Sequence, residues 1–150
     1  MSTMLRNRTW VGAVALASAV GFLAGCSQMS KMMHGGGQEV TLSGSNEVPS
    51  VSTSASGSGT VTVNSDRTVS ARITVTGMTA TAAHIHQGAP GANGPVIVPF
   101  TKSGDNTFVA PEGAKMTEDQ YNAYKAGNTY VNVHSAKNPG GEVRAQLKGS

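Results

Sequence analysis

Apolar and polar residues alternate with a period of two through much of the chain after residue 37. In the segment 69–76, Val69, Ala71, Ile73 and Val75 fall on one side and polar residues on the other, as in a strand with one buried face. Comparable segments, bounded by Gly, Pro, Asn or Ser, are 38–42, 56–64, 82–87, 96–100, 107–110, 129–134 and 141–147. About eight short strands predict an all-β fold, an antiparallel Greek-key-like β-sandwich or barrel.

One short helix interrupts this pattern after residue 117. Thr117 and Gln120 have the spacing of a capping box, with Thr117 at the N-cap and Gln120 at the third helical position. Met116 and Tyr121 flank the cap at the positions of a hydrophobic staple. Gly127 offers the left-handed residue that commonly ends a helix.

The first 25 residues have the pattern of an export signal. Arg6 and Arg8 precede an apolar run over 11–23, and small residues follow it. The run is well short of the roughly 20 residues that a membrane-spanning helix needs. The sequence Leu-Ala-Gly-Cys over 23–26 resembles the lipobox of bacterial lipoproteins, which implies cleavage before Cys26 and acylation of that residue. The alternative is an ordinary signal peptide with a chance cysteine.

These features divide the chain into three parts. Residues 1–25 are the lipoprotein signal peptide, 26–37 a flexible tether rich in Met and Gly, and 38–148 one folded domain. The whole chain has 11 Lys and Arg against 8 Asp and Glu, but two of the basic residues lie in the signal peptide. The mature protein is therefore nearly neutral, which removes the main electrostatic support for nucleic-acid binding. The one cysteine excludes an internal disulfide.

Three histidines of the domain fall on one side of their predicted strands. His84 and His86 are two residues apart, so both project from the same face, and Ala83 and Ile85 point to the core. His134 ends a strand in which Val131 and Val133 face the core. Other residues expected on these outward faces are Tyr130, Asn132, Glu142, Arg144 and Gln146.

Two interpretations of these histidines remain open. A His-x-His pair with a third histidine can hold copper or zinc, because imidazole suits both metals. Glu142, Arg144 and Asn132 would then act around the ligands, orienting a ring or gating anions. Alternatively, the same residues form a hydrogen-bonded polar surface without metal.

The tether contains Met29, Met32, Met33 and His34, and thioether sulfur with a nearby imidazole suits Cu(I). These residues are an accessory metal candidate, although linker composition explains them more simply. The glycine-rich loop 87–95 precedes a predicted strand rather than a helix, which excludes a phosphate-binding loop. No Ser-His-Asp set, Cys-His nucleophile or closely spaced carboxylate pair is evident, so we expect no catalytic residues of those kinds.

Three ordered motifs make the domain resemble a known family. They are Ala-His-Ile-His-x-Gly-x-x-Gly-x-x-Gly-Pro-Val over 83–96, Gly-x-x-Tyr-Val-Asn-Val-His over 127–134, and Asn-Pro-Gly-Gly-Glu-Val-Arg-Ala-Gln-Leu over 138–147. Together they resemble the CHRD domain, named from the extracellular protein chordin and found in many exported bacterial proteins. The resemblance covers about 38–148 and implies an all-β domain, but it does not imply an activity.

A weaker similarity concerns the copper half of Cu,Zn superoxide dismutases. It implies that His84, His86 and His134 match three copper ligands. The chain departs from that family by lacking a bridging histidine, a zinc subsite and a cysteine pair. These departures put dismutase activity in doubt even if copper binds.

These observations lead to three functional hypotheses. The first is an exported, lipid-anchored cell-envelope protein, facing the periplasm or the surface, that binds copper for handling or protection rather than turnover. The second is a structural or adhesive module in which the polar face binds a protein or a glycan. The third, least supported, is a copper enzyme of the dismutase kind.

The anchor gives the first testable prediction. Cys26→Ser should abolish lipidation and release the protein from membranes, because the remaining apolar run is too short to span a bilayer. Ser27 after the cysteine favours the outer membrane in the lipoproteins that this chain resembles. Cell fractionation with intact-mass measurement tests both statements, and a soluble, unlipidated wild-type protein would rule the anchor out.

Overall fold

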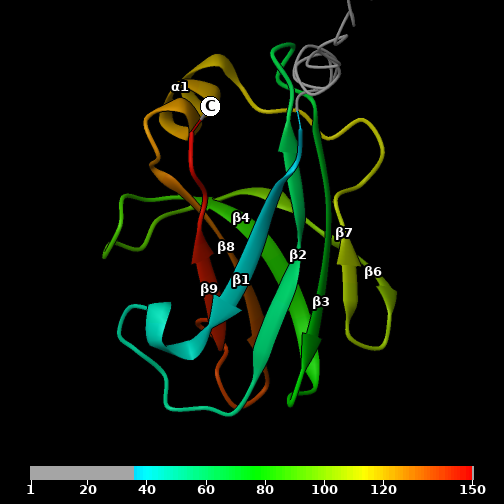
Figure 1. Cartoon of the computed structure of the whole chain (residues 1–150), viewed down its shortest axis with the longest axis vertical. Coiled ribbons are helices and arrows are strands. Elements are labelled where there is room, and N and C mark those ends of the chain that lie inside the picture. The colour runs from blue at the N-terminus through cyan, green and yellow to red at the C-terminus, as the bar shows by residue number, and fades with distance from the viewer. Residues whose placement is uncertain (1–35, 150) are drawn as a thin grey trace, which may run out of the picture. The chain divides into compact units, whose positions relative to one another are not determined.

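In residues 36–149, which the computed structural model describes, nine strands form one antiparallel sheet (Figure 1). The strands are β1 (Gln38–Ser43), β2 (Ser56–Val63), β3 (Val69–Thr76), β4 (Ala80–Gln87), β5 (Val96–Pro99), β6 (Thr101–Gly104), β7 (Thr107–Val109), β8 (Thr129–Ser135) and β9 (Val143–Gln146). A 3-10 helix (Gly44–Asn46) follows β1, and α1 (Glu118–Lys125) precedes β8. This architecture confirms the predicted all-β fold with one short helix.

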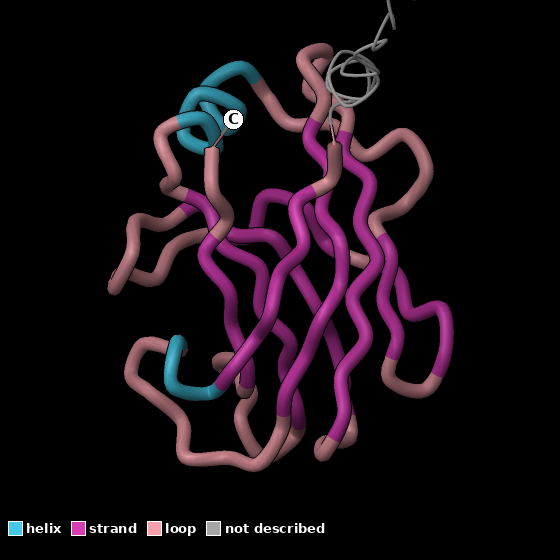
Figure 2. The backbone as a smooth tube through the Cα atoms, in the orientation of Figure 1, coloured by secondary structure: helices cyan, strands magenta, loops and turns pink. Residues whose placement is uncertain are grey.

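The sheet curls until its two edges approach each other. Its strand order is β5-β4-β8-β9-β1-β2-β3-β7-β6, so the edge strands β5 and β6 are consecutive in the chain. Only Phe100 separates them, and its N–H donates to Ala83 O at 3.0 Å. The continuous curve of the strands is visible in Figure 2, and the result is a nearly closed barrel.

The inside of the barrel is filled by the apolar residues that alternate along the strands. In β3 the inward positions Val69, Ile73 and Val75 are buried, whereas the intervening residues are largely exposed. Leu42, Val61, Ile85, Val131, Val133 and Val143 are all completely buried in the same core. The predicted strand phases are therefore confirmed, including those of β4 and β8.

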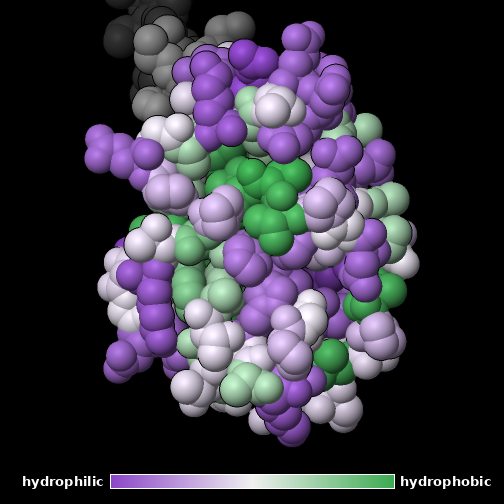
Figure 3. Space-filling view, turned by 180° about the vertical axis from the view of Figure 1, so that it is seen from behind, coloured by the Kyte–Doolittle hydropathy of each residue, from purple (hydrophilic) through white to green (hydrophobic). Residues whose placement is uncertain are grey.

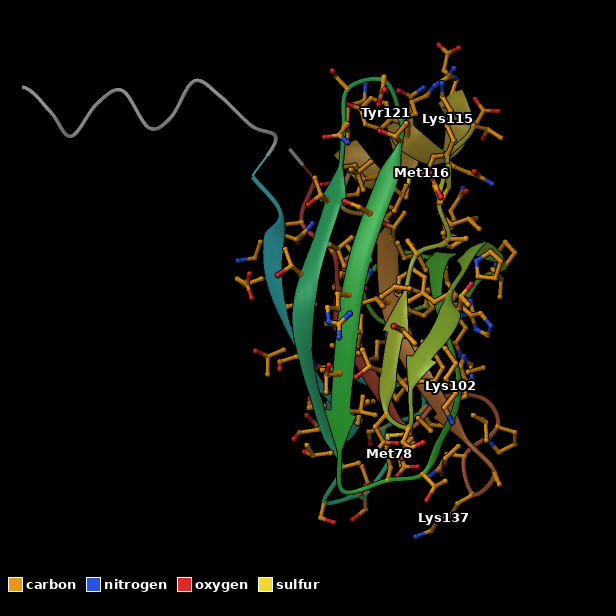
Figure 4. All side chains as sticks on the ribbon, turned by 90° about the vertical axis from the view of Figure 1, so that its right-hand side faces the viewer. Met78, Lys102, Lys115, Met116, Tyr121 and Lys137 are labelled. Atoms are coloured by element: carbon orange, nitrogen blue, oxygen red, sulfur yellow. The ribbon has the colours of Figure 1, made fainter. Side chains whose placement is uncertain are left out.

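The helix begins and ends where its sequence signals predict. Thr117 Oγ1 accepts a hydrogen bond from the Gln120 N–H, and the Gln120 side chain accepts one from the Thr117 N–H. Gly127 follows the helix with a φ of 75°. Met116 and Tyr121 pack into and against the core at the end of the barrel that α1 covers (Figure 4). Neither helix of the described residues is long and apolar enough to cross a membrane.

One strand differs from the expected elements. The strand β6 was not expected, because all four of its residues are exposed and show no alternation.

The surface seen from behind is mostly polar, but apolar side chains gather at its centre (Figure 3). Among the described residues Val96, 45% exposed, is the one large hydrophobic side chain that is clearly open to solvent.

A substitution at Val133 tests the assignment of inward and outward residues in β8. Val133→Asp should lower the free energy of unfolding by about 4 kcal/mol, because it buries an unpaired charge in the core. Val96→Asp is the matched control and should change the free energy of unfolding by about 0.5 kcal/mol or less. Chemical denaturation measures both values, and equal midpoints for the two variants would contradict the assigned phase.

Candidate metal centre

The strand β8 lies between β4 and β9, and this order gathers the polar residues of three strands. In the register, Asn132 pairs with His84 on one side and Arg144 on the other. Tyr130 likewise lies between His86 and Gln146. Since paired residues of an antiparallel sheet share a face, these side chains and His134 point away from the core together. We call this set the histidine face: His84, His86, Tyr130, Asn132, His134, Arg144 and Gln146.

The three histidines converge at one end of the histidine face. His84 Nδ1 lies 3.0 Å from His134 Nε2, and one ring nitrogen from each of His84, His86 and His134 lies within 4.8 Å of the others. Two nitrogens on one metal ion are at most about 4.2 Å apart, twice the usual metal–nitrogen bond. A small movement of the rings therefore brings all three within bonding distance, so the cluster could hold a metal ion.

Backbone carbonyls determine which nitrogen two of these rings present. His86 Nδ1–H donates to Gly94 O at 2.9 Å, and His134 Nδ1–H donates to Pro139 O at 2.9 Å. Because a carbonyl can only accept, both rings carry their proton on Nδ1 and leave Nε2 as an electron-pair donor. The His86 Nε2 is buried and has no hydrogen-bond partner in the protein. In the metal-free protein His134 Nε2 can therefore only accept, and His84 Nδ1–H donates the hydrogen bond between these two rings.

The outward direction of the histidine face was predicted correctly, but the face is not a wet surface. His86 is 8% exposed, His134 9% and Asn132 1%. Segments 44–51, 88–95 and 136–141 cover it, as contacts of Arg144 and His134 with those segments show. Periodicity cannot reveal this, because an outward polar residue under a loop has the same pattern as one in solvent.

Burial keeps the imidazoles of His84 and His86 neutral. Desolvation lowers the pKa of His84 to about 4, and the neighbouring His134 and His86 add to the effect because like charges would repel. The pKa of His86 is also lowered, chiefly by desolvation, although its hydrogen bond to Gly94 opposes the change. Neutral imidazole is the form that binds metal, so His84 and His86 are ready to coordinate at neutral pH.

A stack of three side chains holds the loop 88–95 beside His86. The rings of His86 and Tyr130 are parallel within 2° with centroids 4.8 Å apart, and Arg144 Cζ lies 3.4 Å from the Tyr130 centroid. Arg144 donates to Ala92 O and to Asn93 Oδ1. Arg144 therefore ties down the loop whose Gly94 carbonyl orients His86. Gly94 has no room for a side chain, since a Cβ there would collide with Gln87 O.

The hydrogen bonds of Glu142 go to hydroxyl groups and not to the imidazoles. Its carboxylate accepts from Thr53 Oγ1 at 2.7 Å and from Ser135 Oγ, and the Ser135 bond is the main cause of its lowered pKa. These bonds fasten the β8–β9 connection, in which Pro139 O orients His134. Asn132 Nδ2 donates weakly to Gly140 O at 3.5 Å in the same connection. The accessory candidates Met29, Met32, Met33 and His34, and the lipidation residue Cys26, lie outside the described residues.

Glu47 was missed by the sequence analysis. It follows the 3-10 helix and is only 6% exposed, and its Oε1 has no hydrogen-bond partner in the protein. Burial raises its pKa to about 7, although Arg144 and Asn132 oppose the rise. A Cβ on Gly141 would come within 2.5 Å of Glu47 Oε1 and 2.6 Å of Asn132 Nδ2, so the carboxylate lies against the middle of the histidine face. A loop glutamate gives no sequence signal of such burial.

Comparison with known families identifies the domain. The family model of the CHRD domain matches residues 39–147, which is most of the chain. The chain belongs to the CHRD domain family. All seven residues of the histidine face lie within this CHRD domain, as do Glu47 and Glu142. No curated protein and no solved structure matches the chain.

The lowered pKa of His84 gives a prediction for the metal-free CHRD domain. Between about pH 6.5 and 4 the unfolded chain binds a proton at this residue that the folded domain does not bind. The free energy of unfolding should therefore fall as the pH falls through this window, and His84→Asn should make that fall shallower. Denaturation in the presence of a chelator measures the slope, and equal slopes for the two proteins would disprove the assignment.

Proposed function

We propose that this protein is a lipid-anchored, exported envelope protein whose CHRD domain binds a metal ion through His84, His86 and His134, for handling or protection. The observation that carries the proposal is the convergence of three imidazoles, two of which donate Nδ1–H to backbone carbonyls and so present Nε2 as an electron-pair donor. Such carbonyl partners are a regular feature of metal-binding histidines, because they fix the tautomer and the ring orientation. The proposed anchor is Cys26.

Copper is the metal that the ligand set favours. Imidazole suits copper and zinc, and the affinity of a nitrogen site for divalent metals is highest for Cu(II). Three neutral ligands leave the full charge of the ion uncompensated within the cluster itself. A role in storage or protection requires only that the ion is bound.

A second candidate function is binding of a protein or glycan by the domain as a structural or adhesive module. It is favoured by a groove of about 840 Å³ that is lined by several hydroxyl groups and by the apolar side chains of Met78 and Ala136. Met78 lies near the end of the barrel away from α1 (Figure 4). The hydroxyls belong to Ser52, Thr53, Ser54, Thr79 and Ser135. Hydroxyl groups donate and accept hydrogen bonds equally well, as a sugar requires.

Metal titration distinguishes the two candidates. The domain 36–150, without the tether, should bind Cu(II) at neutral pH and release it as the pH falls and the imidazoles protonate. His84→Ala, His86→Ala and His134→Ala should each weaken binding by at least about tenfold, and the triple variant should abolish it. Calorimetry with Cu(II), Zn(II) and Cu(I) makes the measurement. Equal, weak binding by wild type and the triple variant would reject the metal site and favour the module.

A further inference from the structure

We propose that Glu47 is the charge-compensating carboxylate of the metal centre and serves metal binding rather than the stability of the fold. The inference rests on the proposed function, since it assigns a role to Glu47 at that same site. It identifies a fourth functional residue, from a segment of the chain that supplies none of the histidines.

The position of Glu47 is set by the segment that covers the histidine face. The Glu47 N–H donates to Gly44 O at 3.1 Å, and the Val51 N–H donates to the same carbonyl at 2.9 Å, so the segment turns back on itself. Asn46 Nδ2 fastens it to β9 through Arg144 O at 3.1 Å. The turn thereby carries the Glu47 side chain inward over Asn132, the residue that lies between His84 and Arg144 in the register.

The seven residues of the histidine face include a positive group, Arg144, but no carboxylate. Arg144 on β9 is 2% exposed and positively charged, and it donates to Ala92 O, Asn93 and Gln146 rather than to a carboxylate. Asn132 on β8 is neutral. Glu47 also lines a cavity of about 390 Å³ together with Lys137 and with Pro139, whose carbonyl orients His134. A divalent ion on three neutral imidazoles would add two positive charges beside Arg144, and Glu47 is the carboxylate buried against this face.

The surroundings of Glu47 do not explain it as a structural residue. Its Oε1 is buried without a close hydrogen-bond partner. Burial outweighs the opposing effects of Arg144, Asn132 and the Val48 backbone and raises the pKa of the carboxyl, so a negative charge at this position is unfavourable for the fold. Glu142 shows the contrast, because both of its oxygens accept hydrogen bonds and it fastens two segments. A neutral glutamine of the same shape would remove the cost of burying a charge at position 47. That cost is offset when a cation binds nearby.

The test compares Glu47→Gln with Glu112→Gln in the domain 36–150. Both variants remove one negative charge, but Glu112 is exposed. The Glu47→Gln variant should raise the thermal midpoint of the metal-free domain at pH 8. It should also weaken Cu(II) and Zn(II) binding by roughly tenfold or more, and Cu(I) binding by less, because a monovalent ion needs less compensation. Glu112→Gln should leave the midpoint and all three affinities close to wild type.

The outcomes separate this inference from the proposed function. If wild type binds none of the three metals, the proposed function fails and this inference fails with it. If wild type binds metal and Glu47→Gln binds every metal equally well, only the role of Glu47 is disproved. A lower midpoint with an equal loss for monovalent and divalent ions would also disprove it, since that result is expected of a residue that only supports the fold.

Discussion

The placement of β8 between β4 and β9 is the constraint on which the rest of the domain depends. Every residue of β8 is buried, because one side of the strand faces the core and loops cover the other. The alternation along β8 sends Val131 and Val133 inward and sends Asn132 and His134 to the histidine face. A slip of one residue in either pairing would exchange these sets, placing imidazole and amide groups in the core. The apolar residues of β8 therefore determine the position of the polar ones.

The histidine face is a layer of polar residues on the outside of the barrel that is nevertheless shielded from solvent. Three segments cover it, and each is hydrogen-bonded to a residue of the face. Arg144 donates to Ala92 O in 88–95, and His134 donates to Pro139 O in 136–141. The Arg144 carbonyl accepts from Asn46 Nδ2 in 44–51. The same bonds satisfy the buried donors and orient the imidazoles. Buried polar groups of this kind rigidify a site when they are fully paired, and the atoms left unpaired mark where a ligand would contribute. Here those atoms include His86 Nε2 and Glu47 Oε1.

Much of this could be predicted from the sequence, and the failures share one cause. Period-two alternation is a local signal, so it located β3 and the phases of β4 and β8, and the capping residues located α1. It also placed the three histidines on one side of their strands. The strand β6 was not predicted, because its residues are all exposed and its pairing with β7 gives it no apolar side. The burial of the histidine face and of Glu47 depends on where loops fold back in space, and loop residues carry no periodicity that records it.

A buried site of this kind implies a balance between stability and binding. The lowered pKa values of His84 and His86 show that the fold disfavours charge on the imidazoles, and the raised pKa of Glu47 shows that it disfavours charge on the carboxylate. In the metal-free domain, burial therefore disfavours a charge on each of these side chains. A bound cation reverses the balance for the carboxylate, because a nearby positive charge favours its ionised form, and it occupies the free imidazole nitrogens. The features that weaken the metal-free domain are thus those that a bound metal ion would convert into stabilising contacts, which is the linkage that the proposed metal site requires.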